Sequence, residues 1–228
     1  MSAKAVTFGI AIALSLAAVA GWAETDACDG GGLAVTAPET ALAERVCSVA
    51  VAARERMAAC DLRQSQPISI IIQKGVVVDA FECLGAFHCD TNEIELIHPQ
   101  ALAENVPASR TYAGLSPMAV FDSLVVHEMA HALLEQTLGE REVGVAAHEY
   151  VAYAMQLSSL SPEDRAIFTA QYSAQASGTS DGLNAIVMMF APGAFATSAW
   201  MHFTEPGNGC AFVEDLIEGR AILDLPPL

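Results

Sequence analysis

The segment from Ser116 to Gly139 constrains the fold of this chain more than any other part of the sequence. Ser116 is a good helix N-cap, Pro117 suits the first helical position, and Gly139 suits the end of a helix. The residues between them are apolar on nearly every side, whereas a surface helix carries a broad polar face. The sequence therefore predicts a buried helix over residues 117–138.

This helix contains the stretch VVHEMAHALLEQ, in which His127 and His131 stand four residues apart. Side chains at this spacing share one helix face, about 5–6 Å apart at Cβ, so two imidazole nitrogens can bind one Zn²⁺ ion. Glu128 points to the edge of the same site, where its carboxylate could accept a proton from water. The pattern predicts a zinc site with two histidine ligands and Glu128 as general base.

A third ligand is expected from the following segment, VGVAAHEYVAYAMQ, which also predicts an apolar helix. Glu149 lies there among small apolar residues, where an uncompensated carboxylate is costly and a bound cation would compensate it. Two alternatives are that Glu149 pairs with an arginine, such as Arg141 or Arg110, or that it reaches solvent. His148, its neighbour, is a second candidate ligand.

With these residues the chain resembles the gluzincin group of zinc metallopeptidases, in which a glutamate from a following helix completes an H-E-x-x-H site. The resemblance covers roughly residues 68–158 and is nearest to exported members whose function is not characterised. It implies a zincin-like fold and one zinc ion per chain, bound by His127, His131 and Glu149. It also implies that Glu128 is the general base.

A zinc hydrolase also needs a group that orients a ligand histidine and a donor for the oxyanion. The position four residues after Glu149 is acidic in thermolysin-like members but is Tyr153 here, so Asp122 or a backbone carbonyl is expected to orient a ligand histidine. A hydrolase also needs a donor for the developing oxyanion. His202 is our catalytic candidate for that donor, although it could instead meet the last carbonyls of its own helix. The other candidates are Tyr150, Tyr153 and His148.

The remaining pattern predicts an α+β fold, with a small sheet packed against the H-E-x-x-H helix and further helices on the C-terminal side. Thr36 is the expected N-cap of the first helix. Three short strands are expected in PISIIIQ, GVVVDAF and NEIELIHP, after the glycine-rich, flexible DGGGLAV. The predicted single domain, 24–228, contains a helix over about 37–59, the sheet over about 68–98, active-site helices over about 117–158 and C-terminal helices over about 161–220.

Residues 1–23 predict export. Lys4 precedes a long apolar run, and Gly21-Trp22-Ala23 is typical of a signal-peptidase cleavage site. Because the run is long for a signal, an uncleaved anchor is the alternative. We expect a secreted or periplasmic protein without a membrane span after cleavage.

All six cysteines follow this signal, and an even number in an exported chain predicts three disulfides. Cys83 and Cys89 are expected to close a small loop. Cys47 and Cys60 lie on one predicted helix, about 20 Å apart, and therefore cannot pair with each other unless that helix breaks. If the first bond forms, Cys28 and Cys210 each take one of these two, in either order.

The net charge of −17 argues against nucleic acid and anionic membranes as partners. The expected partner is a peptide or protein substrate, and the main hypothesis is an exported zinc-dependent metalloendopeptidase or amidase. One alternative is a zinc-binding protein without turnover, because a fold can keep its site and lose activity. The other is a disulfide-stapled interaction protein in which the histidines only pack.

Overall fold

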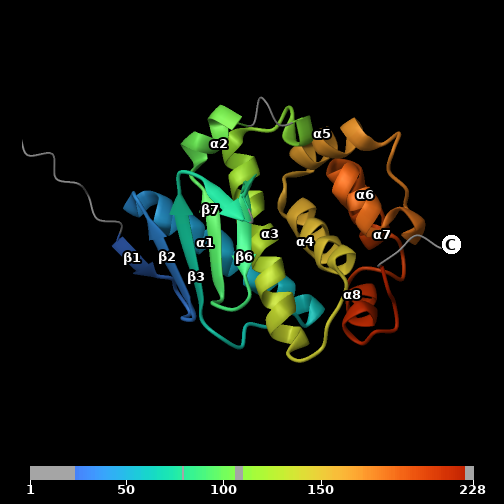
Figure 1. Cartoon of the computed structure of the whole chain (residues 1–228), viewed down its shortest axis with the longest axis horizontal. Coiled ribbons are helices and arrows are strands. Elements are labelled where there is room, and N and C mark those ends of the chain that lie inside the picture. Colours follow the sequence, from blue (N-terminus) through green and yellow to red (C-terminus); the bar gives the residue numbers. More distant parts are fainter. Residues whose placement is uncertain (1–23, 79, 106–109, 224–228) are drawn as a thin grey trace, which may run out of the picture.

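The computed structural model describes residues 24–78, 80–105 and 110–223. A small mixed β-sheet packs on one face against two helices; the short helix Pro99–Asn105 lies above the sheet, and the helices from Val145 onward gather on the far side of one of the two helices (Figure 1). The architecture is therefore α+β, as the sequence predicts.

Five strands form the main sheet in the order β1-β2-β3-β7-β6. Strands β2, β3 and β7 run parallel, whereas β1 and β6 run antiparallel to their neighbours. Because β6 is the last strand in this order, it is an edge strand. The strands are β1 (Glu24–Ala27), β2 (Leu33–Ala37), β3 (Ile68–Gln73), β6 (Gly85–His88) and β7 (Glu93–Ile97), and a separate hairpin pairs β4 (Val76–Val78) with β5 (Phe81–Cys83).

The central strands alternate buried and partly exposed side chains. Strand β3 buries Ile68, Ile70 and Ile72 and leaves the residues between them partly exposed. The three predicted strands correspond to β3, β4 and β7, so four further strands in the described part of the chain were not predicted. The expectation that Thr36 caps a helix is wrong, because Thr36 lies in β2 opposite Thr25 of β1. Glycines at positive φ in DGGG make the turn between β1 and β2.

The two helices against the sheet are α1 (Thr40–Met57) and α3 (Pro117–Leu138), which also contact each other. Helix α4 (Val145–Ser159) packs on α3, and α7 (Pro192–Thr204) packs on α4. Shorter helices complete the fold: α2 (Pro99–Asn105), α5 (Pro162–Tyr172), α6 (Ala185–Phe190) and α8 (Cys210–Ile217), with 3₁₀ turns η1 (Ala58–Cys60), η2 (Arg110–Tyr112) and η3 (Ser180–Gly182).

Helix α3 is the buried centre of the molecule, and its predicted ends are confirmed. The Ser116 hydroxyl accepts a hydrogen bond from the Ala119 amide, Pro117 is the first helical residue, and Gly139 ends the helix at a positive φ. The helix is apolar all round because it lies between the sheet and α1 on one side and α4 on the other. This position holds its two histidines in the interior, facing α4.

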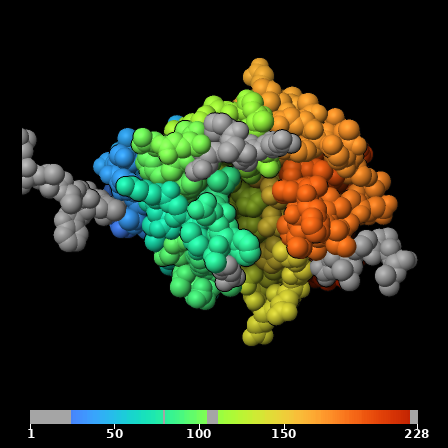
Figure 2. All heavy atoms as spheres, turned by 45° about the horizontal axis from the view of Figure 1, so that its top comes forward, coloured from blue at the N-terminus to red at the C-terminus, as the bar shows by residue number. Residues whose placement is uncertain are grey.

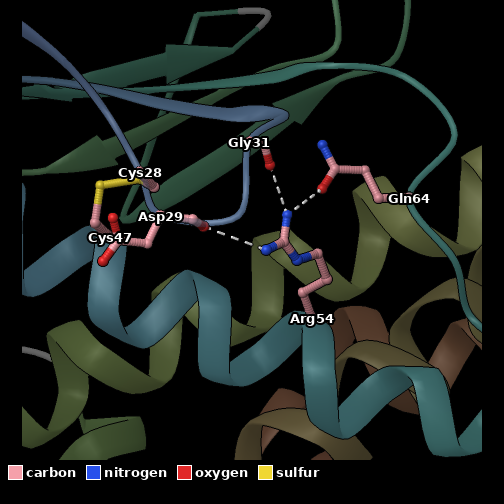
Figure 3. The surroundings of a disulfide bond; sticks show 6 residues. All are labelled: Cys28, Asp29, Gly31, Cys47, Arg54 and Gln64. Carbon is pink, nitrogen blue, oxygen red and sulfur yellow. Dashed lines mark hydrogen bonds between the residues drawn. A yellow bond between two sulfur atoms is a disulfide. The ribbon is translucent and has the colours of Figure 1, made fainter.

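Two disulfides tie α1 to distant parts of the chain. Cys28–Cys47 joins it to the β1–β2 turn, where Arg54 of the same helix donates to the Gly31 carbonyl (Figure 3). Cys60–Cys210 joins the end of the α1–η1 segment to α8 across a sequence separation of 150. As predicted, Cys47 and Cys60 do not pair with each other and bond instead to Cys28 and Cys210.

The expected Cys83–Cys89 disulfide is absent, since both residues, which lie in the described part of the chain, are free thiols. The segment between them is strand β6, and the Leu84 carbonyl extends its pairing by accepting from the Ile97 amide. At about 3.3 Å per residue, the paired stretch from Leu84 to His88 covers about 13 Å. A disulfide requires Cα atoms within about 7 Å, so the strand keeps the two thiols apart.

Within the described residues, no helix has the length and apolar character needed to cross a membrane. The predicted signal peptide, residues 1–23, lies outside the described residues. The two disulfides are consistent with an exported protein.

Candidate metal centre

Helices α3 and α4 bring the three predicted ligands together. The Nε2 atoms of His127 and His131 lie 3.2 Å apart. Glu149 of α4 places one carboxylate oxygen 3.6 Å from Nε2 of His127 and the other 3.6 Å from Nε2 of His131. The three ligand atoms of this cluster lie within 4.8 Å of one another, so they converge on one point between the helices.

These separations fit a tetrahedral metal ion. Two ligand atoms at about 2.0–2.1 Å from a tetrahedral zinc ion stand about 3.3–3.4 Å apart. The separation of 3.2 Å between the imidazoles and that of 3.6 Å from each imidazole to the carboxylate oxygen nearer to it lie on either side of that value. The donor set, two neutral nitrogens and a carboxylate, also suits zinc.

A buried hydrogen-bond network orients His127. Its Nδ1 lies 3.0 Å from Oε1 of Gln156, while the amide nitrogen of Gln156 donates to Oγ of Ser123 and to the hydroxyl of Tyr112. Because that nitrogen serves two oxygens, the amide oxygen accepts from the imidazole and Nδ1 carries the proton. The lone pair of Nε2 is then directed at the point where Glu149 converges, which is the tautomer that a metal ligand needs.

Gln156 was not predicted, and Asp122 does not take the expected role. The carboxylate of Asp122 accepts from the guanidinium of Arg45, with Nε–Oδ1 at 2.8 Å, and so links α3 to α1. Gln156 follows Glu149 by seven residues, two helical turns, and therefore lies on the same face of α4. A glutamine two turns after Glu149, on the same face of a largely apolar helix, was the signal in the sequence that could have identified it.

Glu128 lies beside the cluster and is 5% exposed. Burial, and secondarily the nearby charge of Glu149, raise the pKa of Glu128 to about 8. Its carboxylate faces strand β6 at Gly85, where an added Cβ would stand 2.7 Å from Oε1. Glycine at this point lets the edge strand pass directly over Glu128 without displacing that side chain.

The electrostatics of the cluster favour a cation. Burial lowers the pKa of His127 to about 4, and burial and the neighbouring imidazoles keep the pKa of His131 well below its usual value. Both histidines therefore offer lone pairs at neutral pH. Burial also raises the pKa of Glu149 to about 7. Burial thus disfavours the ionised form of both carboxyl groups, which lie beside two neutral imidazoles. A bound metal ion would stabilise the two carboxylates.

The cluster opens into a cavity of about 480 Å³. Figure 2 shows the surface hollowed between the green strand region and the orange α6–α7 region. Residues of α3 and α4 line the cavity on one side, and residues of β5, β6 and the chain around them line it on the other. The lining residues are Val78, Cys83, Gly85, Ala86, Phe87, Cys89, His127, Glu128, His131, Glu135, His148, Glu149 and Tyr153.

Two of the four oxyanion-donor candidates lie in this cavity. The ring of Tyr153 stands edge-on to His127 with centroids 4.7 Å apart, and His148 lies beside His131 with its Nε2 3.8 Å from a carboxylate oxygen of Glu135. His202 does not line the cavity. Its Nδ1 lies 3.0 Å from the hydroxyl of Tyr150, and its ring packs on Phe212.

The alternative arginine partner for Glu149 is not found at Arg141. That guanidinium donates to the Thr137 carbonyl near the end of α3 and lies 3.3 Å from a carboxylate oxygen of Glu218. The side chain of Arg110 lies outside the described residues. The ionic neighbours of Glu149 in the described part of the chain are therefore the two histidines.

Residues 33–226 match DUF6639, a family of unknown function. The chain belongs to this family. No curated protein and no solved structure matches it. The matched region contains every residue of the candidate centre. The description of the family assigns it no activity.

Proposed function

We propose that this protein is an exported zinc-dependent hydrolase, a metalloendopeptidase or amidase built on a zincin-like arrangement of sheet and helices. The observation that carries the proposal is the convergence of His127, His131 and Glu149 on one point at separations suited to a tetrahedral ion. The placement of Glu128 beside that point supports turnover over simple storage, because a second acid beside the three ligands is not needed to hold the metal.

A bound zinc ion would lower the pKa of a water molecule and polarise a substrate carbonyl. Glu128 accepts the proton of the attacking water and then returns it to the leaving nitrogen. Burial raises the pKa of Glu128, so its ionised carboxylate is a stronger base than that of an exposed glutamate. Tyr153 and His148, which line the cavity, are the candidates for donating a hydrogen bond to the oxyanion.

Strand β6 supplies the surface for an extended substrate. It is the edge strand of the sheet, and it passes over Glu128 at Gly85. A peptide in extended conformation can pair with the backbone groups of an edge strand and thereby place a scissile bond beside the centre. We therefore propose a peptide or protein chain as the substrate.

The test is hydrolysis of a peptide library by the protein purified after export of the full chain. We expect cleavage that a chelator abolishes and added zinc restores. Glu128→Gln should retain zinc and lose at least about 100-fold in rate, the scale of general-base catalysis. Glu163→Gln, an exposed acid of α5, is the matched control and should cleave as wild type does. Zinc binding without cleavage of any peptide would refute the hydrolase and leave a metal-binding protein.

A further inference from the structure

Two cysteines line the cavity of the candidate centre in addition to its ligands. Cys83 ends strand β5 and is partly buried, whereas Cys89 follows strand β6 and is exposed. Both are free thiols, although the same chain contains two disulfides. Strand β6 lies between these two thiols, so a disulfide between them would compete with the pairing of that strand.

The competition follows from the position of strand β6 between the two thiols. The strand pairs residue by residue with β7, from Gly85 opposite Leu96 to His88 opposite Glu93. While it is paired, the distance along the strand exceeds the Cα separation that a disulfide allows. The two thiols can therefore join only if the strand leaves β7 and becomes a loop.

We propose that Cys83 and Cys89 form a redox modification site: a small-molecule disulfide oxidises them to an intramolecular disulfide, which removes strand β6 from the edge of the cavity. The segment from Cys83 to Cys89 thus has two states: free thiols with strand β6 paired to β7, and a disulfide with that strand unpaired. Because Gly85 of β6 lies against Glu128, loss of the strand would change the surroundings of Glu128. The effect on turnover rests on the proposed function.

The chemistry is thiol–disulfide exchange. The exposed Cys89 thiolate attacks one sulfur of the small disulfide RSSR, displaces RS⁻ and forms a mixed disulfide. The Cys83 thiolate then attacks the Cys89 sulfur, displaces the second RS⁻ and closes the Cys83–Cys89 bond. The two cysteines lose two electrons to the small disulfide, and their two protons pass to the two released thiolates.

The ligands of the metal lie on helices α3 and α4 and not on the strand, so the two states should differ in one wall of the cavity and not in the centre itself. We expect the oxidised protein to keep its metal and to lose the edge to which an extended peptide would pair. Reduction would restore the strand.

The experiment uses the protein purified after export of the full chain and equilibrated in buffers of reduced and oxidised glutathione. Peptide mapping without reduction identifies the Cys83–Cys89 bond, and hydrogen exchange is measured for the amides shared by β6 and β7. The amides shared by β3 and β7 are the internal control, since that pairing does not involve β6. Zinc content is measured in both states.

We expect the bond to form within one chain and exchange in β6 to quicken by about tenfold or more, while β3–β7 protection and zinc content stay unchanged. Cys89→Ser should abolish both changes, and Cys83→Ser provides an independent second variant. A bond that forms while β6 exchange stays slow would overturn the proposal, as would the absence of an intramolecular bond at every glutathione ratio. Because exchange is read without turnover, this result stands apart from success or failure of the hydrolase assay.

Discussion

Replacing Gln156 by leucine removes the side chain that orients His127 and changes little in volume. The amide oxygen accepts from Nδ1 of the imidazole at 3.0 Å, and the amide nitrogen donates to Ser123 and Tyr112 at 3.0 and 3.2 Å. Loss of the acceptor leaves the imidazole free to rotate or to change tautomer. Partners of this kind are worth about 10- to 100-fold in metal affinity, so zinc binding should weaken by about 1.4–2.8 kcal/mol.

The conservative variant separates orientation from packing. Gln156→Glu keeps an oxygen acceptor for Nδ1, and we expect it to bind zinc within about threefold of wild type. Both variants leave the Tyr112 hydroxyl without the glutamine donor and should destabilise the metal-free protein by about 1–3 kcal/mol. Thr197→Val is the control: it removes a buried hydroxyl that donates to the Gly193 carbonyl in α7, and should leave zinc affinity unchanged.

The assay is competition for zinc with a chromophoric chelator, together with urea unfolding of each metal-free variant. If the leucine variant binds zinc as tightly as wild type does, the oriented-ligand argument is refuted. Equal weakening in the leucine and glutamate variants would attribute the loss to packing and not to the hydrogen bond.

Three further predictions concern stability. Gly85→Ala would place a Cβ 2.7 Å from Oε1 of Glu128, so it should lower the free energy of unfolding by about 1–3 kcal/mol in urea titrations. The pKa of Glu128 is raised from 4.5 to about 8, so the folded, metal-free protein holds this proton more tightly than the unfolded chain does. The contribution of Glu128 to stability should therefore be lost as pH rises from about 4.5 through 8, and Glu149, whose pKa is raised to about 7, acts in the same direction. Above about pH 7.5, where histidines are mostly neutral in both states, Glu128→Gln should flatten the remaining fall. Removing the Cys60–Cys210 disulfide by serine substitution frees a loop of 150 residues and should cost about 5 kcal/mol in chain entropy, measured by calorimetry against wild type.

The parts of the site that local sequence determines were predictable. Caps at Ser116 and Gly139 fix the ends of α3, and the four-residue spacing of His127 and His131 fixes their common face. The position of Glu149 followed from the cost of a carboxylate in an apolar helix. These features depend on residues within a few turns of one another, so the sequence specifies them directly.

The parts that depend on distant partners were not predictable in the same way. Strands β1 and β6 have four residues each, and what makes them strands is their pairing with β2 and β7. Without β6, the spacing of Cys83 and Cys89 reads as a small disulfide loop. His202 lies outside the cavity and contacts Tyr150 instead. This contact joins two distant helices, so a local sequence pattern does not predict it.

The most direct test of the central claim is the amount of zinc bound per chain, measured by inductively coupled plasma mass spectrometry on the protein purified after export without chelator. Wild type is compared with His131→Ala, Glu149→Ala and the control His98→Ala, a histidine that pairs with Glu39 away from the centre. The account predicts about one zinc per chain in wild type and control and a large loss in the other two variants. No zinc in wild type, even after zinc is added back, would contradict it.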